Sequence, residues 1–230
     1  MTQRLRVTFA KDGPLRWIAH LDLMRTWERT IRRAGLPLSY TQGFSPHPRI
    51  ALAAPLPVGV SGARELIDLW LEENISTSEI AKQLTAAMPP GLAVSAVEQV
   101  SEQLPSMQSC IEAARYEIRF DRDALEIDGL TTTIDELLAC EVLEWEEQRG
   151  EKTRRYDIRA TILDLAIAAS EGNDTVISMY LSLREGRTGR PAQVLVALGV
   201  KGEPLEIVRA SIELDSRAGT SSGASVASGS

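Results

Sequence analysis

The sequence predicts an α+β protein made of two ferredoxin-like (split βαβ) antiparallel-sheet sandwiches in tandem. The first observation is that several short segments alternate apolar and polar residues, which is typical of half-buried strands. The second is that segments with helical spacing separate these strands in the order β-α-β-β-α-β. The third is that the second half of the chain repeats a similar order with one additional strand.

The first hundred residues contain one complete set of elements. Basic and apolar residues alternate over 4–10, as in a half-buried strand, and helical spacing follows over 15–35, with Gly35 as its stop. The segment 36–48 is rich in Pro, Ser and Gly and predicts a loop. Further strands are expected over 49–56, 65–73 and 92–100, and a capped helix that ends at Pro-Pro-Gly is expected over 76–91.

The second half is expected to form a further α+β unit. Helices are predicted over 127–140 and over 189–199, the latter with Pro191 in its first turn and Gly199 at its end. The strands of this half are predicted at 114–121, 141–148, 153–168, 175–185 and 206–214. The chain therefore divides into an N-terminal domain (1–100), a linker (101–111), a C-terminal domain (112–214) and a Gly/Ser-rich tail that we expect to be disordered (215–230).

Composition points to a cytoplasmic protein rather than to a secreted or membrane protein. Hydrophobic residues make up 43% and charged residues 25% of the 230, as in ordinary globular proteins. No apolar run approaches the roughly 20 residues that span a bilayer, and the N-terminus has no apolar signal core. Cys110 and Cys140 stand alone, so we expect no disulfide framework, no metal and no cofactor.

Charge is distributed unevenly along the chain. The net charge of -7 argues against indiscriminate coating of nucleic acid, and nothing in the sequence indicates DNA specificity. Residues 1–50 hold nine basic and three acidic residues, a balance of +6, which leaves −13 for the other 180 residues. A basic end on an acidic body predicts a local anionic partner.

Four arginines are predicted to share one side of the first helix. On a helical wheel the apolar residues of 20–34 lie on one side, and the opposite side, here called the arginine face, carries Arg25, Arg29, Arg32 and Arg33. This face is either an ordinary solvated helix surface or a ridge that contacts phosphate, which forked guanidinium donors suit well. Arginines of elements expected to pack beside the helix would extend the same basic surface, namely Arg4, Arg6, Arg16 and Arg49.

The segment GFSPHPR, residues 43–49, is a stiff loop that contains one of only two histidines. Prolines flank His47 and restrict the backbone on both sides of it. The loop is a structural turn, an RNA contact in which Phe44 stacks on a base while His47 and Arg49 face the strand, or a catalytic loop in which His47 is the general base of metal-independent RNA cleavage. His20 is a core or capping histidine, or a second catalytic histidine.

A second anion site is a further candidate, in the predicted strand 153–168. Strand alternation would place Arg155, Asp157 and Arg159 on one face, either as mutual salt pairs or with Arg155 and Arg159 holding an anion. The common phosphate-loop, dinucleotide-binding, zinc-protease and serine-hydrolase motifs do not occur in the sequence.

Several separate motifs, in order, resemble a bacterial family of unknown function, the radical-SAM-linked proteins. They are the His-Leu-Asp helix start (20–22), the basic helix end (32–33), GFSPHP (43–48), Pro-Leu-Pro-x-Gly (55–59), MPPG (88–91), YDIR (156–159), GRP (189–191) and VRASIEL (208–214). The resemblance implies a radical-SAM partner, encoded nearby or fused in relatives, and a role in RNA modification or ribosome biology. This chain lacks the C-x-x-x-C-x-x-C of a radical-SAM cluster, so such chemistry would belong to the partner.

Three functions are therefore open. The first is a non-catalytic module that binds RNA or presents a substrate to a radical-SAM partner, in which case the chain itself is not an enzyme. The second is a small endoribonuclease that uses His47, and here the helix and loop loosely resemble the RAMP-type CRISPR repeat-cleaving endoribonucleases with their tandem ferredoxin-like domains. The third is a protein–protein adaptor for the radical-SAM partner.

Overall fold

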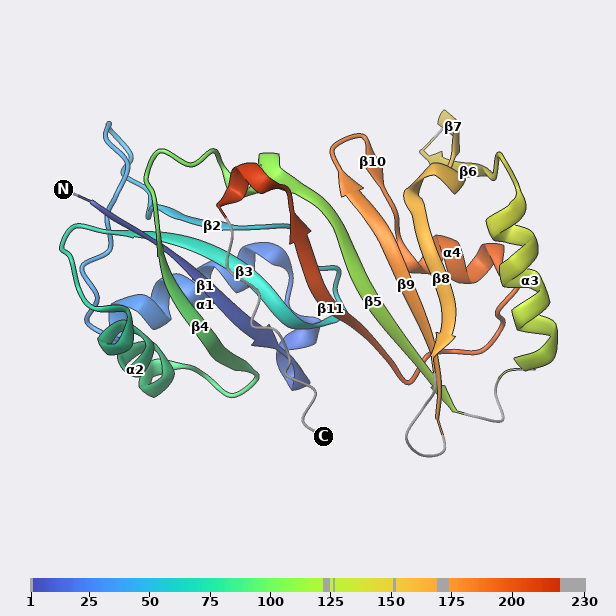
Figure 1. Cartoon of the computed structure of the whole chain (residues 1–230). Coiled ribbons are helices and arrows are strands. Elements are labelled where there is room, and N and C mark those ends of the chain that lie inside the picture. Colours follow the sequence, from blue (N-terminus) through green and yellow to red (C-terminus); the bar gives the residue numbers. More distant parts are fainter. Residues whose placement is uncertain (1, 122–124, 126, 151, 169–173, 220–230) are drawn as a thin grey trace, which may run out of the picture.

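One large sheet runs along most of the molecule (Figure 1). The computed structural model describes residues 2–121, 125, 127–150, 152–168 and 174–219. Within these residues the chain is an α+β protein with four α-helices, a nine-stranded and mostly antiparallel sheet, and a separate two-stranded sheet. The predicted α+β class is therefore confirmed.

The first half follows the predicted order of elements. Its apolar helix positions and its Ser cap explain the two helices: Leu23, Trp27 and Ile31 form one buried stripe, and Ser76 Oγ accepts a hydrogen bond from Glu79 N at 3.3 Å. The elements are β1 (Gln3–Lys11), α1 (His20–Arg33), β2 (Ile50–Leu52), β3 (Ser61–Leu71), α2 (Thr77–Ala87) and β4 (Leu92–Val100), with a 3-10 turn η1 (Gly13–Trp17) before α1.

The second half departs from the prediction at its middle. The elements are η2 (Met107–Cys110), β5 (Ile111–Asp121), α3 (Ile127–Ala139), β6 (Glu144–Arg149), β7 (Lys152–Asp157), η4 (Arg159–Thr161), β8 (Ile162–Ala168), β9 (Asp174–Arg184), β10 (Arg187–Thr188), α4 (Pro191–Ala197), β11 (Glu206–Leu214) and η5 (Ser216–Ala218). The single strand expected over 153–168 is wrong, because a 3-10 turn at η4 divides it into β7 and β8.

Strands from both halves hydrogen-bond in the same sheet. The order is β10-β9-β5-β11-β3-β1-β4, with β2 also paired to β3 and β8 also paired to β9. The halves meet where β11 runs parallel to the start of β3, pairing Val208 with Ser61 and Arg209 with Gly62. The two halves are therefore joined edge to edge rather than connected only through a linker.

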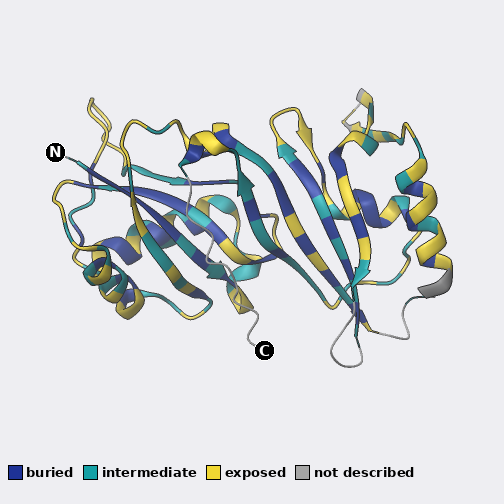
Figure 2. Ribbon diagram, viewed as in Figure 1, coloured by how far each residue is buried: buried dark blue, intermediate teal, exposed yellow. Residues whose placement is uncertain are grey.

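Two hydrophobic cores lie along this sheet, one in each half. In the first, Leu5, Val7 and Phe9 of β1 pack against α1, and the rings of Phe9 and Trp27 meet edge to face with centroids 4.9 Å apart. In the second, the buried side of β5 packs against residues of α3 and α4 such as Ile134 and Val194. Figure 2 shows the buried residues running along the central strands.

The other side of β1 carries a buried ionic cluster instead of a basic surface. Arg4 and Arg6 are only 2% and 4% exposed, and both pair with Asp68 of β3, at 2.7 and 2.9 Å. Their remaining donors reach carbonyl oxygens of Leu104 at 2.6 Å and Ala218 at 2.9 Å. The expectation that Arg4 and Arg6 extend the arginine face is wrong, because strand alternation places them on the side that the segments 101–110 and 215–219 cover.

Part of the expected tail belongs to the folded structure. Asp215 N donates to Cys110 O at 2.8 Å, Arg217 donates to Ser109 O at 3.1 Å, and Ala218 is 1% exposed. Residues 215–219 are thus ordered against the linker, and the rest of the expected tail, 220–230, lies outside the described residues. Among the described helices none is long and apolar enough to cross a membrane.

Candidate functional site

The loop of residues 41–47 is an ordered excursion with an aromatic ring at its tip. Tyr40 bridges to Pro48 at its base, and Thr41 N donates to His47 O while His47 N donates to Thr41 Oγ1, both at 2.9 Å. Gly43 has φ 127°, a backbone conformation that residues other than glycine rarely adopt. Phe44 is fully exposed. The loop therefore holds an apolar ring in water on a hydrogen-bonded support.

The base of this loop lies on the side of the sheet away from α1. The Arg49 guanidinium lies 4.9 Å from the ring centroid of Trp70, and Arg4 lies 5.1 Å from the same centroid. Arg49 therefore shares a side with the buried Arg4, whereas α1 covers the opposite side. In Figure 1 the light-blue excursion between α1 and β2 also projects away from the helix. The single basic surface expected from the loop and the arginine face together is not formed.

The arginine face itself is partly neutralised within α1. Arg25 pairs with Asp22 at 3.2 Å and Arg32 with Glu28 at 2.9 Å, and these guanidiniums remain largely exposed. Arg29 donates to Thr26 Oγ1 at 3.3 Å and has no carboxylate partner in the described part of the chain. Arg33 donates to Ala87 O at 2.6 Å, at the end of α2. All four predicted arginines are therefore exposed residues. Two of them pair with a carboxylate within α1, and Arg33 joins α1 to α2.

The two histidines are not joined to each other. His20 begins α1, and its Nδ1 is buried with no hydrogen-bond partner among the described residues. His47 lies exposed in the loop, and no side-chain contact connects it with His20 in the described residues. The described residues also contain no group of three or more His, Cys, Asp or Glu placed to hold a metal ion.

The predicted second anion pair is separated by the break in the strand. Arg155 lies on β7 and pairs with Glu146 of β6 at 2.8 Å. Arg159 lies in η4, and its guanidinium donates to the carbonyl oxygens of Leu138, Cys140 and Ile162 at 2.7 to 3.2 Å. Arg159 therefore closes the end of α3, and the expected common face with Arg155 is not formed, because β7 ends at Asp157.

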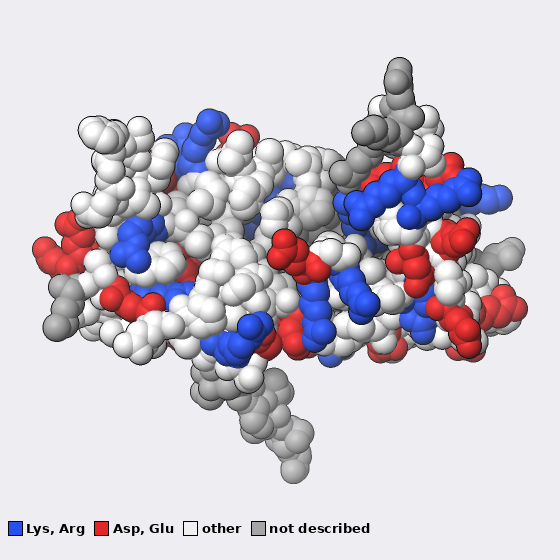
Figure 3. Space-filling view, turned by 90° about the horizontal axis from the view of Figure 1, so that it is seen from above, with Lys and Arg blue, Asp and Glu red and all other residues white. Residues whose placement is uncertain are grey.

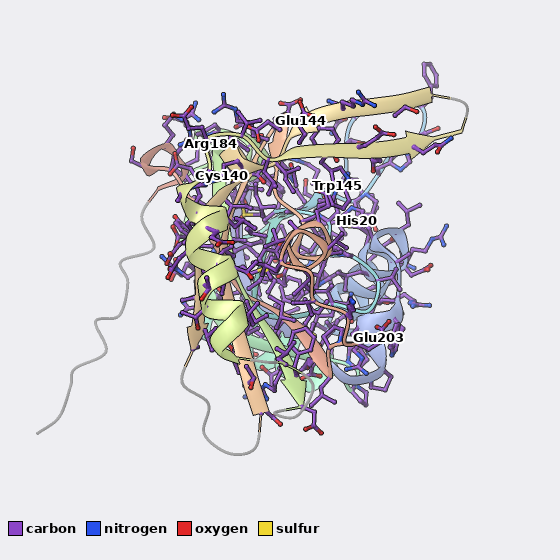
Figure 4. The ribbon with its side chains drawn as sticks, turned by 90° about the vertical axis from the view of Figure 1, so that its right-hand side faces the viewer. His20, Cys140, Glu144, Trp145, Arg184 and Glu203 are labelled. Atoms are coloured by element: carbon purple, nitrogen blue, oxygen red, sulfur yellow. The ribbon has the colours of Figure 1, made fainter. Side chains whose placement is uncertain are left out.

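A polar cavity lies beside the β6–β7 hairpin. Figure 4 shows this hairpin as an arm that projects from the body, with Glu144 near its base. The cavity has a volume of about 380 Å³ and is lined by Glu147, Arg154, Tyr156, Asp157, Ala160, Thr161, Gly186, Arg187, Thr188 and Arg190. None of its arginines was among the candidate site residues; the signal in the sequence was the pair Arg187 and Arg190 around the GRP motif.

Comparison with solved structures finds weak likenesses. They include the archaeal box H/ACA sRNP Nop10-Cbf5 complex, with 12% identity, a TM-score of 0.43 and coverage of 89% of this chain and 46% of that chain. A Cbf5-Nop10-Gar1 complex gives 11% identity, a TM-score of 0.45 and coverage of 89% and 48%. This chain spans about half the length of the chains it matches there. At such TM-scores these likenesses say nothing about activity.

Comparison with protein families gives a definite result. No curated protein matches the sequence at a significant level. The family described as "Uncharacterized protein conserved in bacteria (DUF2344)" matches residues 4–191. This match covers most of the chain, from β1 to the first residue of α4. The chain therefore belongs to the DUF2344 family of bacterial proteins.

Proposed function

We propose that the chain is a non-catalytic RNA-binding module that presents RNA to a partner enzyme. The observation that carries the proposal is Phe44, a fully exposed aromatic ring on a loop whose base is hydrogen-bonded. Stacking of a base on such a ring is tolerant of sequence and contributes about 1–3 kcal/mol per base. A rigid support increases this contribution, because little conformational freedom is lost on binding.

The arginine face supplies the electrostatic part of the proposed interface. Arg29 is the strongest candidate there, since its guanidinium is not balanced by a carboxylate in the described residues. Arg25 and Arg32 keep exposed guanidiniums that can exchange an intrahelical partner for a phosphate. The loop and the arginine face lie apart, so an RNA that touches both has to pass around the edge of the sheet.

The test is binding of fluorescent single-stranded RNA to the full chain at several salt concentrations. Phe44→Ala should weaken binding about 5- to 150-fold, the equivalent of one lost base stack. Arg29→Ala should lower the slope of log affinity against log salt by about 0.7, the value for one phosphate contact on a single strand.

Val196→Ala is the matched control for Phe44→Ala, because Val196 is also exposed, at 63%, and lies on α4 in the other half. It should bind RNA as the unchanged protein does. Absence of RNA binding at low salt would remove the proposal. If the unchanged protein cleaves the RNA and His47→Ala does not, the result would favour the ribonuclease over the RNA-binding module.

The radical-SAM partner is a separate part of the proposal and depends on the sequence resemblance. Of the two thiols, Cys110 is buried and Cys140 Sγ donates to Leu137 O at 3.0 Å, so the chain brings no cysteine cluster of its own. This partner can be tested by crosslinking the tagged protein in its native cell and identifying the bound RNA and the bound proteins. Recovery of RNA without any radical-SAM protein would exclude this partner.

The adaptor function keeps one specific observation in its favour. Trp17, at the end of η1, and Leu21, at the start of α1, are 61% and 66% exposed. Trp17 lies against Gly59 of the Pro-Leu-Pro-x-Gly segment, next to the exposed Val58. Exposed apolar side chains of this size often mark protein contacts. Co-purification of a partner that survives nuclease treatment and is lost in Trp17→Ala would favour the adaptor over the RNA-binding module.

We also propose that each half is one ferredoxin-like unit. The support is the repeated strand order, β4-β1-β3-β2 in the first half and β11-β5-β9-β8 in the second, with two helices in each. In this view β6, β7 and β10 are additions to the second unit.

A further inference from the structure

The cavity beside the β6–β7 arm combines elements from three parts of the second half. The arm contributes Arg154 and Tyr156, the turn η4 contributes Thr161, and the segment from β10 to the start of α4 contributes Arg187 and Arg190. Its volume of about 380 Å³ lies within the usual range of small-ligand pockets. In Figure 3, Lys and Arg side chains gather in a band over this end of the molecule.

The acidic side chains of the cavity are already engaged. Glu147 pairs with Arg190 at 3.0 Å. Asp157 Oδ1 accepts hydrogen bonds from Leu143 N at 2.9 Å and from Arg159 N at 2.8 Å. Three arginines and two carboxylates line the cavity, so the formal charge of its lining is +1. Each carboxylate already has a hydrogen-bonding or ionic partner.

Two guanidiniums remain without a carboxylate. Neither Arg154 nor Arg187 makes an ion pair within the part of the chain that the structure describes. The Arg154 guanidinium lies 5.3 Å from the ring centroid of Tyr156. That ring is fixed in turn, because its hydroxyl accepts a hydrogen bond from Gln193 Nε2 at 2.7 Å. Arg154 is thus oriented by the cavity wall. Glu147 lies opposite it in the β6–β7 register, but this carboxylate forms its ion pair with Arg190.

We propose that this cavity binds a phosphomonoester. The two guanidiniums that have no ion-pair partner are free to face a group that carries a charge of about −1.5 to −2 near neutral pH, and the forked donors of arginine suit its oxygens. Arg154 and Arg187 contact the phosphate, and Thr188 and Tyr156 line the space for the rest of the ligand. We choose a nucleotide as the carrier of this phosphate, either free or at the 5′ end of an RNA strand, and this choice rests on the proposed RNA-binding function.

The site is independent of the proposed RNA contact at Phe44. It lies in the other half of the sheet, and none of its lining residues belongs to the first half. Phe44→Ala should therefore leave phosphomonoester binding unchanged. The two proposals can therefore fail separately. Loss of RNA binding with phosphomonoester binding retained counts against the proposed function alone, and the reverse result counts against this inference alone.

The experiment is calorimetric titration of the full chain with uridine monophosphate and with a short RNA that carries either a 5′-phosphate or a 5′-hydroxyl. The double variant Arg154→Gln/Arg187→Gln should bind uridine monophosphate at least about tenfold more weakly, since a charged hydrogen bond contributes about 1.5–3 kcal/mol. Preference for 5′-phosphorylated over 5′-hydroxyl RNA assigns the phosphate to an RNA end. Equal binding of the two RNAs, with tight binding of the nucleotide, assigns it to a free nucleotide.

The matched control is Arg155→Gln/Arg184→Gln. It removes the same charge from neighbouring positions whose guanidiniums pair with Glu146 and Glu112 and do not line the cavity. This variant should bind the nucleotide as the unchanged protein does. An equal loss in both double variants would show a diffuse charge effect and overturn the site, as would absence of binding by the unchanged protein.

Discussion

Lys11 places an ionisable amine almost entirely out of water at the end of β1. Its side chain is 1% exposed, and its Nζ lies 3.5 Å from the carbonyl oxygen of Arg16. Burial lowers the pKa of Lys11 below the ordinary value of 10.5; the nearby Glu65 opposes this effect and Arg209 adds to it. The charged form of Lys11 is therefore less favourable in the folded chain than in the unfolded chain.

This lowered pKa predicts a pH dependence of stability. Between the lowered pKa and 10.5 the unfolded chain binds more protons than the folded chain, so the contribution of Lys11 to the free energy of unfolding rises with pH. The unchanged protein should gain stability relative to Lys11→Met as pH is raised from neutral toward 10.5, as measured by urea unfolding. Lys82→Met, at an exposed position on α2, should show no such trend. Parallel pH profiles for the unchanged protein and Lys11→Met would contradict the prediction.

At the scale of elements, the turn after α2 is hydrogen-bonded to the residue that follows β1. Gly91 has φ 89° and its carbonyl accepts a hydrogen bond from Asp12 N at 2.9 Å. A Cβ at this position would lie only 2.8 Å from the Asp12 carbonyl oxygen. The MPPG segment therefore requires glycine at its end, both for the positive φ of Gly91 and for the close approach of the backbone at Asp12. Gly35, which ends α1, has φ 71° but has open space where its Cβ would be.

These two glycines form a matched pair of substitutions. Gly35→Ala should lower the free energy of unfolding by roughly 1–2 kcal/mol, the cost of a left-handed conformation with a side chain. Gly91→Ala should cost more than this, because the backbone at Asp12 also has to move. Urea unfolding of the two variants compares them directly. Equal losses would show that the contact with Asp12 is accommodated without strain.

At the scale of the whole molecule, the seam between the halves depends on a buried ion pair. Arg209 of β11 and Glu65 of β3 are 1% and 3% exposed and bind through two hydrogen bonds of 2.5 and 2.8 Å. Arg209 also donates to the carbonyl oxygens of Ala54 and Pro55. Gly62 leaves the room for this arrangement, since a Cβ there would lie 2.5 Å from the Glu65 side chain. The ion pair thus adds a second connection between β11 and β3, whose parallel pairing includes only two residue pairs.

Glu65→Gln should therefore weaken the junction strongly. It leaves Arg209 buried without a counter-charge, and breaking a buried pair in this way costs about 3–5 kcal/mol. We expect lower stability and a separation of the unfolding of the two halves into distinct calorimetric transitions. Glu112→Gln is the control, because its pair with Arg184 is exposed and should contribute about 0–1 kcal/mol. A single transition of unchanged midpoint in Glu65→Gln would contradict the role of the pair.

Local patterns were sufficient to predict many elements. Helical spacing with Gly35 as its stop predicted the end of α1, and the Ser cap together with Pro-Pro-Gly predicted α2. The start expected at residue 15 was wrong, because η1 ends at Trp17 and the extended backbone of Ile18 and Ala19 separates it from α1. Both signals arise within a few residues, where steric and hydrogen-bonding preferences act directly. The break between β7 and β8 was missed because Ile158 to Thr161 contain neither Gly nor Pro, and the turn depends on the Asp157 side chain.

The position of the arginines was decided by tertiary packing. Sequence alone identified the exposed residues Arg25, Arg29 and Arg32 and the unusual loop around Phe44. It did not reveal that Arg4 and Arg6 are buried and both paired with Asp68, since that carboxylate is more than sixty residues away in the chain. The cavity around Arg154 and Arg187 likewise arises only when η4, β7 and β10 come together.

The sequence by itself determined the α+β class, the existence and order of the helices and the family motifs of this protein. The tertiary structure alone decided that the two halves share one sheet and which basic side chains remain free to meet an anion. The physical reason is that local backbone preferences act over a few residues, whereas strand pairing and charge compensation join residues far apart in the chain.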